Sequence, residues 1–124
     1  MEVKDITIKV KDLDVQDVLC NGLEGGIGYW GGIENYVFPE GKTTDDYTYP
    51  HLELPFEDGG AVILKDHYGD EEDLKIDKEA LERGLQIMAN KYQWHFMNIL
   101  NDNADAETGD VLVQCATMGD IVYG

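Results

Sequence analysis

The chain has 124 residues, and its 26 acidic side chains against nine lysines and arginines give a formal charge of −17. A surface of that sign repels DNA, RNA and anionic membranes and favours encounter with basic proteins, so we expect neither direct nucleic-acid binding nor membrane association. The length fits a single domain, 1–124, with a substantial core. No apolar run approaches the roughly 18 residues of a membrane span, and the first residues lack the apolar block of a signal peptide, which predicts a cytoplasmic protein.

The first 30 residues combine a strand pattern with a helix pattern. Residues 5–12 (DITIKVKD) alternate polar and apolar side chains, which predicts a half-buried strand with Ile6, Ile8 and Val10 facing the core. Residues 13–30 repeat apolar side chains at helical spacing, which predicts a helix capped by Asp12 or Asp14. Its glycines lower helix propensity by about 1 kcal/mol each, so the helix either frays after residue 24 or packs closely against another element. The apolar positions are Val15, Leu19, Leu23, Ile27 and Trp30.

Strand and turn signals occupy residues 31–69. Segments near Tyr36, Leu52 and Val62 predict an antiparallel hairpin or meander, with a loop at 39–46 (PEGKTTDD) and a turn at 57–60 (EDGG). A further short strand is expected at 74–76.

Helical patterns dominate from Asp77 onward. Asp77 is a good N-cap for a helix, a short second helix follows around residues 94–100, and a last helix ends near Gly119. The order of strand, helix, several strands and several helices predicts an α+β fold, with a small antiparallel sheet of three to five strands packed with about four helices. The residues expected to face the core are Leu81, Leu85, Met88, Phe96, Ile99, Leu100, Val111, Leu112, Cys115 and Met118.

The stretch EGGIGYWGG, residues 24–32, contains the letters of the dinucleotide fingerprint G-x-G-x-x-G. A dinucleotide-binding loop must leave a strand and open a helix, whereas these glycines end a helical pattern, so we do not expect a Rossmann site. Two interpretations remain open. The glycines let another backbone pack closely while Trp30 fills the core, or their amides, beside Tyr29 and Trp30, hold a flat polar ligand.

Catalytic and metal-binding patterns are weak. The chain contains no serine, which excludes serine-triad hydrolases. Cys20 and Cys115 lie in apolar helical patterns, which indicates buried free thiols rather than nucleophiles or a disulfide. Residues 101–112 resemble the start of a calcium loop, but Ala106 replaces the required glycine and Leu112 the bidentate glutamate. We therefore predict a protein that is not an enzyme, with no catalytic residue, no metal site and no cofactor.

Arg83 is the only arginine, and Glu79 stands four residues before it. That spacing predicts an exposed helical ion pair. If an anionic ligand binds, Arg83 is the residue able to grip phosphate through two parallel hydrogen bonds.

Three stretches, LCNGLEGGIGYW, LERGLQIM and DAETGDVLVQCATMGDIVYG, resemble a family of small uncharacterised proteins of tailed bacteriophages and prophages. That family is characterised by E-G-G-I-x-Y-W and by a C-terminal Q-x-A-x-x-G-[DE]-x-V-Y-G motif. The resemblance implies a small accessory phage protein in the cytoplasm of the host bacterium, for which counter-defence is a reasonable role. The matching residues are Glu24, Gly25, Gly26, Ile27, Tyr29, Trp30, Asp110, Gln114, Ala116, Gly119, Asp120, Val122, Tyr123 and Gly124.

Both motifs combine glycine and aromatic residues with polar groups, and they form one concave site if the first and last helices pack together. The leading hypothesis is a non-catalytic counter-defence protein that sequesters a small nucleotide-derived host immune signal, with aromatic rings for the base and Arg83 or glycine amides for phosphate. The predicted ligand-binding residues are Glu24, Gly25, Gly26, Tyr29, Trp30, Arg83, Gln114, Asp120 and Tyr123.

Two alternatives come from other classes of protein. The charge of −17 suits an acidic inhibitor that mimics nucleic acid in the basic groove of a host nuclease, of the anti-CRISPR or anti-restriction type. A phage structural or assembly adaptor is the other alternative. The expected partner is thus a small nucleotide-like ligand or a basic host defence protein, and self-association is left open. The carboxylates predicted to stand for phosphates are Asp66, Asp70, Glu71, Glu72 and Asp73.

Overall fold

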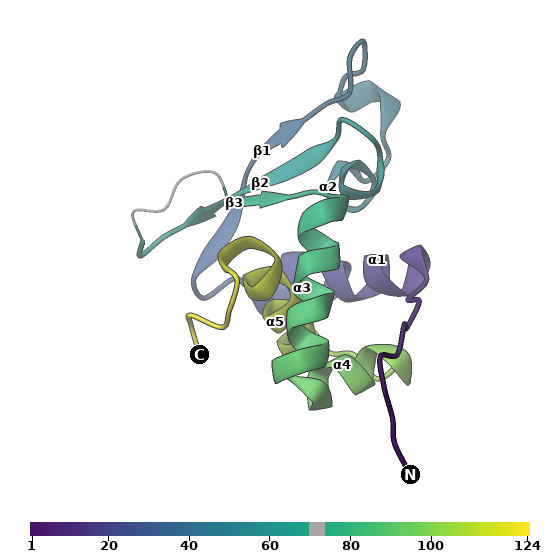
Figure 1. Ribbon diagram of the computed structural model, residues 1–124. Helices are drawn as coiled ribbons and strands as arrows, with labels where there is room; N and C mark the ends of the chain where they lie inside the picture. Colours follow the sequence, from purple (N-terminus) through teal and green to yellow (C-terminus); the bar gives the residue numbers. More distant parts are fainter. Residues whose placement is uncertain (70–73) are drawn as a thin grey trace.

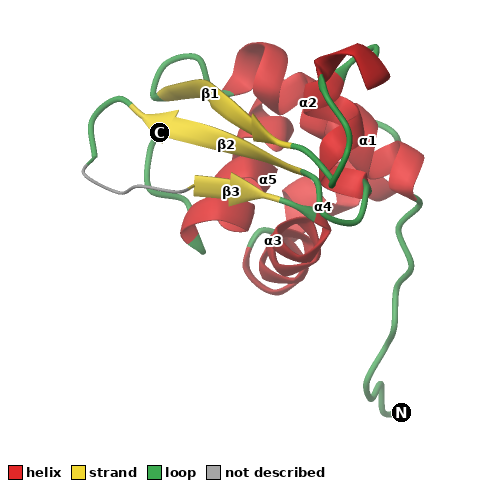
Figure 2. Ribbon diagram, turned by 90° about the horizontal axis from the view of Figure 1, so that it is seen from above, coloured by secondary structure: helices red, strands yellow, loops and turns green. Residues whose placement is uncertain are grey.

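Helices cover one face of a three-stranded antiparallel sheet in the computed structural model, which describes residues 1–69 and 74–124 (Figures 1 and 2). The strands are β1 (Gly31–Val37), β2 (Ala61–Asp66) and β3 (Leu74–Ile76), in the order β1-β2-β3. Tyr36 pairs with Val62, which pairs with Ile76 on its other side. Along β2, Val62 and Leu64 are buried toward the helices, while Lys65 is exposed. This alternation is the reason that the segment forms a strand with one covered face.

Five α-helices and three shorter helical turns accompany the sheet in the described ranges. The first, α1, continues without a break into a π-helical turn, η1. The predicted α+β class is confirmed, as are the N-cap at Asp77, whose side chain accepts from the amide of Ala80 over 2.9 Å, and the end of the last helix at Gly119, with φ of 80°. The bounds are α1 (Asp12–Asn21), η1 (Gly22–Gly26), η2 (Thr44–Asp46), α2 (Pro50–Glu53), η3 (Leu54–Phe56), α3 (Lys78–Lys91), α4 (Gln93–Leu100) and α5 (Ala106–Met118).

Helix α5 lies at the centre of the molecule. It packs against α1, η1, α3, α4 and β3, and its residues from Thr108 to Ala116 are all buried. Because other elements cover α5 on every side, its polar residues are buried as well as its apolar ones. The buried polar residues are Thr108, Asp110 and Gln114, and each needs a hydrogen-bond partner inside the protein. The first and last long helices of the chain are therefore direct neighbours.

Close backbone approach joins η1 to α5. A Cβ atom built on Gly22 would lie 2.6 Å from the carbonyl oxygen of Gly109, and one built on Gly109 would lie 2.3 Å from the amide nitrogen of Gly22. A Cβ on Gly26 would lie 2.3 Å from the carbonyl oxygen of Ala106, whereas Gly25 has open space around it. Close packing is thus the role of Gly22 and Gly26, and the helical pattern continues past residue 24 as a π-helix rather than fraying.

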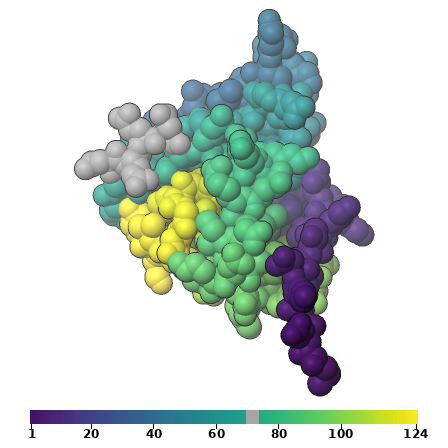
Figure 3. Space-filling model, viewed as in Figure 1, coloured from purple at the N-terminus to yellow at the C-terminus, as the bar shows by residue number. Residues whose placement is uncertain are grey.

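The predicted strand over residues 5–12 is wrong. Residues Met1–Lys11, here called the arm, form neither helix nor strand, and Ile6 and Ile8 are 68% and 51% exposed. Figure 3 shows the arm leaving the body of the molecule. The alternating pattern suits a strand, but within this chain no neighbouring strand of the described residues pairs with it.

Four smaller expectations are also corrected. The segment near Leu52 is not a strand: α2 begins at Pro50, whose fixed φ favours the first turn of a helix, and runs into η3. The N-cap of α1 is Lys11, without a side-chain cap, and Asp12 and Asp14 lie in the first turn of the helix, where the helix dipole favours them. Leu100 is 39% exposed, and Cys20 is only half-buried. No helix of the described ranges has the length and apolarity needed to cross a membrane.

Candidate functional site

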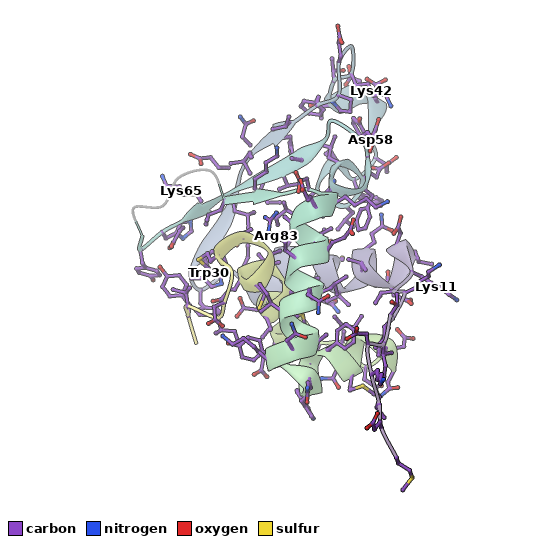
Figure 4. The ribbon with its side chains drawn as sticks, in the orientation of Figure 1. Lys11, Trp30, Lys42, Asp58, Lys65 and Arg83 are labelled. Atoms are coloured by element: carbon purple, nitrogen blue, oxygen red, sulfur yellow. The ribbon has the colours of Figure 1, made fainter. Side chains whose placement is uncertain are left out.

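The Gly/aromatic motif and the C-terminal motif meet at Asp110 of α5. The indole Nε1 of Trp30 donates to Asp110 Oδ1 over 2.8 Å, and the hydroxyl of Tyr29 donates to Asp110 Oδ2 over 2.6 Å. These two aromatic residues follow η1 and precede β1, so the turn at the end of η1 places them against α5. Figure 4 shows Trp30 beside α5. A buried carboxylate with two charge-assisted hydrogen bonds fixes the position of both rings.

Gln114, one helical turn after Asp110, holds the segment that follows α5. Its Oε1 accepts hydrogen bonds from the amides of Val122 and Tyr123 over 2.7 and 2.8 Å. Its Nε2 donates to Asp110 Oδ1 over 2.9 Å and to the carbonyl oxygen of Tyr123 over 3.1 Å. Residues Asp120–Gly124, here called the tail, therefore lie back against α5 although they form no regular structure.

The ring of Tyr123 closes the arrangement. It stacks on Trp30, with ring centroids 5.5 Å apart and an interplanar angle of 19°, and its hydroxyl donates to the Asp66 carboxylate, 2.8 and 2.9 Å from the two oxygens. The amide of Tyr68 also donates to Asp66 over 3.0 Å. Trp30 has no exposed surface. We call Tyr29, Trp30, Asp66, Asp110, Gln114 and Tyr123 the aromatic junction.

The electrostatics of the junction keep its groups in fixed roles. Burial, reinforced by the hydrogen bond to Asp110, raises the pKa of Tyr29 to about 12, so its hydroxyl remains a proton donor. Burial opposes ionisation of Asp66, but the hydrogen bonds from Tyr68 and Tyr123 outweigh it and hold the pKa of Asp66 below its usual value. Every buried side-chain nitrogen and oxygen in the described parts of the chain has a hydrogen-bond partner. The junction is thus a saturated network of protonated donors and carboxylate acceptors, and it presents no activated nucleophile.

Four of the nine predicted ligand-binding residues belong to this junction: Tyr29, Trp30, Gln114 and Tyr123. Asp110 was not among the predicted site residues, although three of these four contact it. Its spacing of four residues before Gln114 on a helix was the available signal.

The other five predicted residues lie elsewhere. Glu24 is exposed and accepts a hydrogen bond from the Cys20 thiol over 2.7 Å, and the His51 ring lies 3.2 Å from the same carboxylate. The hydrogen bond between Cys20 and Glu24, together with burial, raises the pKa of Cys20 to about 11. Gly25 faces open space, and Gly26 packs on α5. The Arg83 guanidinium donates to the carbonyl oxygen of Ala116 over 3.5 Å. Figure 4 shows Arg83 beside α5. Asp120 binds Lys91 over 2.7 Å and accepts from Tyr92.

Two further expectations about charged residues change. The ion pairs of the described residues do not include Glu79 with Arg83. Asp66, predicted to stand for a surface phosphate, is buried in the aromatic junction. The other four of those carboxylates, residues 70–73, lie outside the described residues. Within the described ranges, no cluster of histidine, cysteine and carboxylate side chains is arranged to hold a metal ion.

Charge is distributed unevenly over the fold. Residues 12–64 contain eleven acidic side chains and a single base, Lys42, which is bound to Glu57 over 2.5 Å. They form α1, η1, β1, η2, α2, η3 and the start of β2, and Figure 2 shows α1, α2 and β1 grouped on the side of the molecule opposite α3. Asp12, Glu57 and Asp58 lie at the border of this side, where each lines a groove that Lys78 of α3 also lines. We call this side the acidic side. Its carboxylates are Asp12, Asp14, Asp17, Glu24, Glu34, Glu40, Asp45, Asp46, Glu53, Glu57 and Asp58.

Comparison with protein-family models, with curated proteins and with solved structures yields no match to this chain. The candidate site is therefore interpreted from its own geometry.

Proposed function

We propose that this chain is a non-catalytic inhibitor that binds a basic protein surface in the place of a nucleic acid. The resemblance to small phage proteins makes a host defence nuclease the target that we favour. The observation that carries the proposal is the acidic side, whose residues 12–64 include eleven carboxylates and a single lysine. Carboxylates offer a basic groove the same charge and the same kind of acceptor oxygen as phosphates do.

Helix α1 supports this proposal in detail. Asp12, Asp14 and Asp17 lie on it without a lysine or arginine, and none of the ion pairs of the described residues includes them. Asp14 and Asp17 are about one helical turn apart, a spacing at which like charges repel and destabilise a helix by a few tenths of a kcal/mol. Contact with a cationic partner relieves that repulsion. Helix α1 is in contact with α2, because Gln16 of α1 donates to the carbonyl oxygen of Leu52 in α2 over 2.8 Å.

The test is capture of a partner from lysates of bacteria that carry restriction or CRISPR nucleases. The wild-type chain should retain a nucleic-acid-binding protein at about 50 mM salt, release it by about 200 mM, and lose it to competing duplex DNA. A triple variant, Asp12→Asn, Asp14→Asn and Asp17→Asn, should retain much less. The matched control neutralises three exposed glutamates elsewhere, Glu79→Gln, Glu82→Gln and Glu107→Gln.

Retention that duplex DNA does not reduce, or equal retention by the two triple variants, would contradict the proposal. Circular dichroism on both variants shows that neither has lost its helices, so a loss of retention is attributable to charge.

The aromatic junction favours a second candidate, sequestration of a nucleotide-derived immune signal. The Tyr123 ring on Trp30, and the tail amides on Gln114, occupy the positions that a planar ligand with polar edges would take. Such a ligand would bind by displacing the tail. The support is chemical: Trp30 offers a stacking face, and the Gln114 amide offers one donor and one acceptor to a base edge.

Native mass spectrometry separates this candidate from a purely structural junction. The chain is purified from cells with an active nucleotide-signalling defence and from undefended cells. If the tail competes with a ligand, Tyr123→Ala should increase the fraction carrying a nucleotide mass, because it empties the stacking position. If the junction only stabilises the fold, the same variant should lower the thermal midpoint and carry no added mass in either sample.

A further inference from the structure

The arm exposes apolar side chains that nothing else in the described structure covers. It extends from the start of α1 away from the sheet (Figures 1 and 3). Ile6, Ile8 and Val10 border a groove of about 500 Å³ whose opposite wall comes from the helices, including Leu81 and Phe96. Ile6 and Ile8 nevertheless remain 68% and 51% exposed. An extended segment of this kind presents unpaired backbone groups as well as apolar surface, and both favour pairing with another strand.

The sequence of the arm is complementary to itself when two copies run antiparallel. If Thr7 of one copy lies opposite Thr7 of another, Asp5 faces Lys9 and Ile6 faces Ile8, twice each by symmetry. Residues directly opposite in an antiparallel pair share a face. One face of the ribbon therefore holds four isoleucines, and the other holds two pairs of opposite charge. Shifting the register by one residue would remove both matches.

We propose that two copies of this chain associate through their arms, which pair antiparallel about Thr7 as a two-stranded ribbon. The ribbon places Ile6, Ile8 and Val10 toward the grooves of the two molecules and Asp5 and Lys9 toward solvent. The contact uses the same patch on both copies, which is the arrangement of a closed two-fold dimer. An isolated two-stranded ribbon is marginal in water, and the two grooves supply the apolar surface against which it packs.

The free edge of β1 is a poorer partner for the arm. Its register is interrupted between Ile33 and Asn35, and the Asn35 side chain accepts from the Tyr36 amide over 2.9 Å. A bulge and a locally satisfied amide both discourage an added strand.

Charge also favours the arm as its own partner, because three of the nine basic residues of the chain, Lys4, Lys9 and Lys11, lie in it. Two acidic bodies thus meet through their most basic segments.

Charge reversal at the paired positions tests this dimer by sedimentation equilibrium. The wild-type chain should approach twice its mass of 13.9 kDa as concentration rises. Asp5→Lys places a new lysine opposite Lys9, and Lys9→Asp places two aspartates opposite each other, so each variant should dimerise about tenfold or more weakly. An equimolar mixture of the two variants restores both opposite-charge pairs in a heterodimer, and dimerisation should return. Matched controls are Glu40→Lys and Lys65→Asp, which make the same charge changes at exposed positions outside the arm.

Two outcomes would overturn the proposal. One is a mass of 13.9 kDa at every concentration up to about 1 mM. The other is a dimer that Asp5→Lys and Lys9→Asp affect no more than the controls do, which would assign the contact to another surface. Recovery in the mixture cannot come from an effect on folding or on net charge, because both variants are present there unchanged.

Discussion

For Gly109→Ala, two physical effects predict opposite changes in the free energy of unfolding. In an ordinary helix, alanine is more favourable than glycine by about 1 kcal/mol. In α5, the new Cβ would lie 2.3 Å from the Gly22 amide nitrogen and 2.8 Å from the Val18 carbonyl oxygen. Both are backbone atoms, so no side chain can turn aside, and α1 and η1 must move away from α5 by about 1 Å to reach normal contact.

The cost of that movement is the sum of two effects. Overpacking of a filled core costs about 1–3 kcal/mol or more. The separation also lengthens the 2.8 Å bond between Trp30 and Asp110, and a hydrogen bond to a charged group contributes about 1.5–3 kcal/mol. After subtracting the propensity gain, we expect Gly109→Ala to lower the free energy of unfolding by about 1.5–5 kcal/mol. At about 4 °C per kcal/mol for a chain of this size, the thermal midpoint falls by roughly 6–20 °C.

Urea and thermal denaturation followed by circular dichroism measure this change. The matched control is Gly25→Ala, because a Cβ there meets nothing within 4 Å and the helix gains only propensity. We expect the control to be neutral or stabilising by up to about 1 kcal/mol. If Gly109→Ala were as stable as Gly25→Ala, the close approach of η1 and α5 would be refuted, and with it the placement of Trp30 against Asp110.

Three further predictions concern single side chains. Tyr29→Phe removes the 2.6 Å bond to Asp110 and should lower the free energy of unfolding by about 1–3 kcal/mol in urea denaturation. The hydrogen bond to Glu24 is the main reason that the pKa of Cys20 is raised to about 11. We therefore expect alkylation of Cys20 at pH 8 to be about a hundredfold slower than alkylation of a thiol with the usual pKa. Glu24→Gln should accelerate this reaction, which iodoacetamide labelling with peptide mapping measures. The Asp120 pKa is lowered to about 2, chiefly by the hydrogen bond from Lys91. The ionised Asp120 carboxylate therefore stabilises the fold fully above about pH 4, and this contribution is lost as the pH falls through 2. Asp120→Asn should make the free energy of unfolding less dependent on pH over that range.

Local signals in the sequence predicted the helices whose first or last turn is marked by a capping residue. Helix α3 has a cap at Asp77, and α5 ends at Gly119, where a left-handed turn suits glycine. The arm and the segment at Leu52 could not be predicted in the same way. Alternation indicates which face a strand would bury, but it does not supply the neighbouring strand. At Leu52, the short run after Pro50 fits both a strand and a helical turn, and packing decides between them.

The candidate site was only partly predictable for a related reason. Tyr29, Trp30, Gln114 and Tyr123 are unusual residues in dense motifs, so composition singled them out. Asp110 is one of 26 acidic residues, and apart from its spacing before Gln114 it is distinguished by its burial, which it shares with Asp66. Burial depends on which helices surround α5, and that information is spread over the whole chain.

The central position of α5 has a consequence for the order in which the fold can form. Every helix and strand that packs against α5 precedes it in the chain, and the Trp30–Asp110 bond joins residues 80 positions apart. While the ribosome is still making residues before 106, Trp30 and Ile27 have no α5 to bury them, and the nascent chain exposes its largest apolar groups. Long-range contacts of this kind slow folding and lengthen the exposure of apolar surface. We expect the tertiary structure to form in one step after α5 has left the ribosome, rather than growing from the first helix.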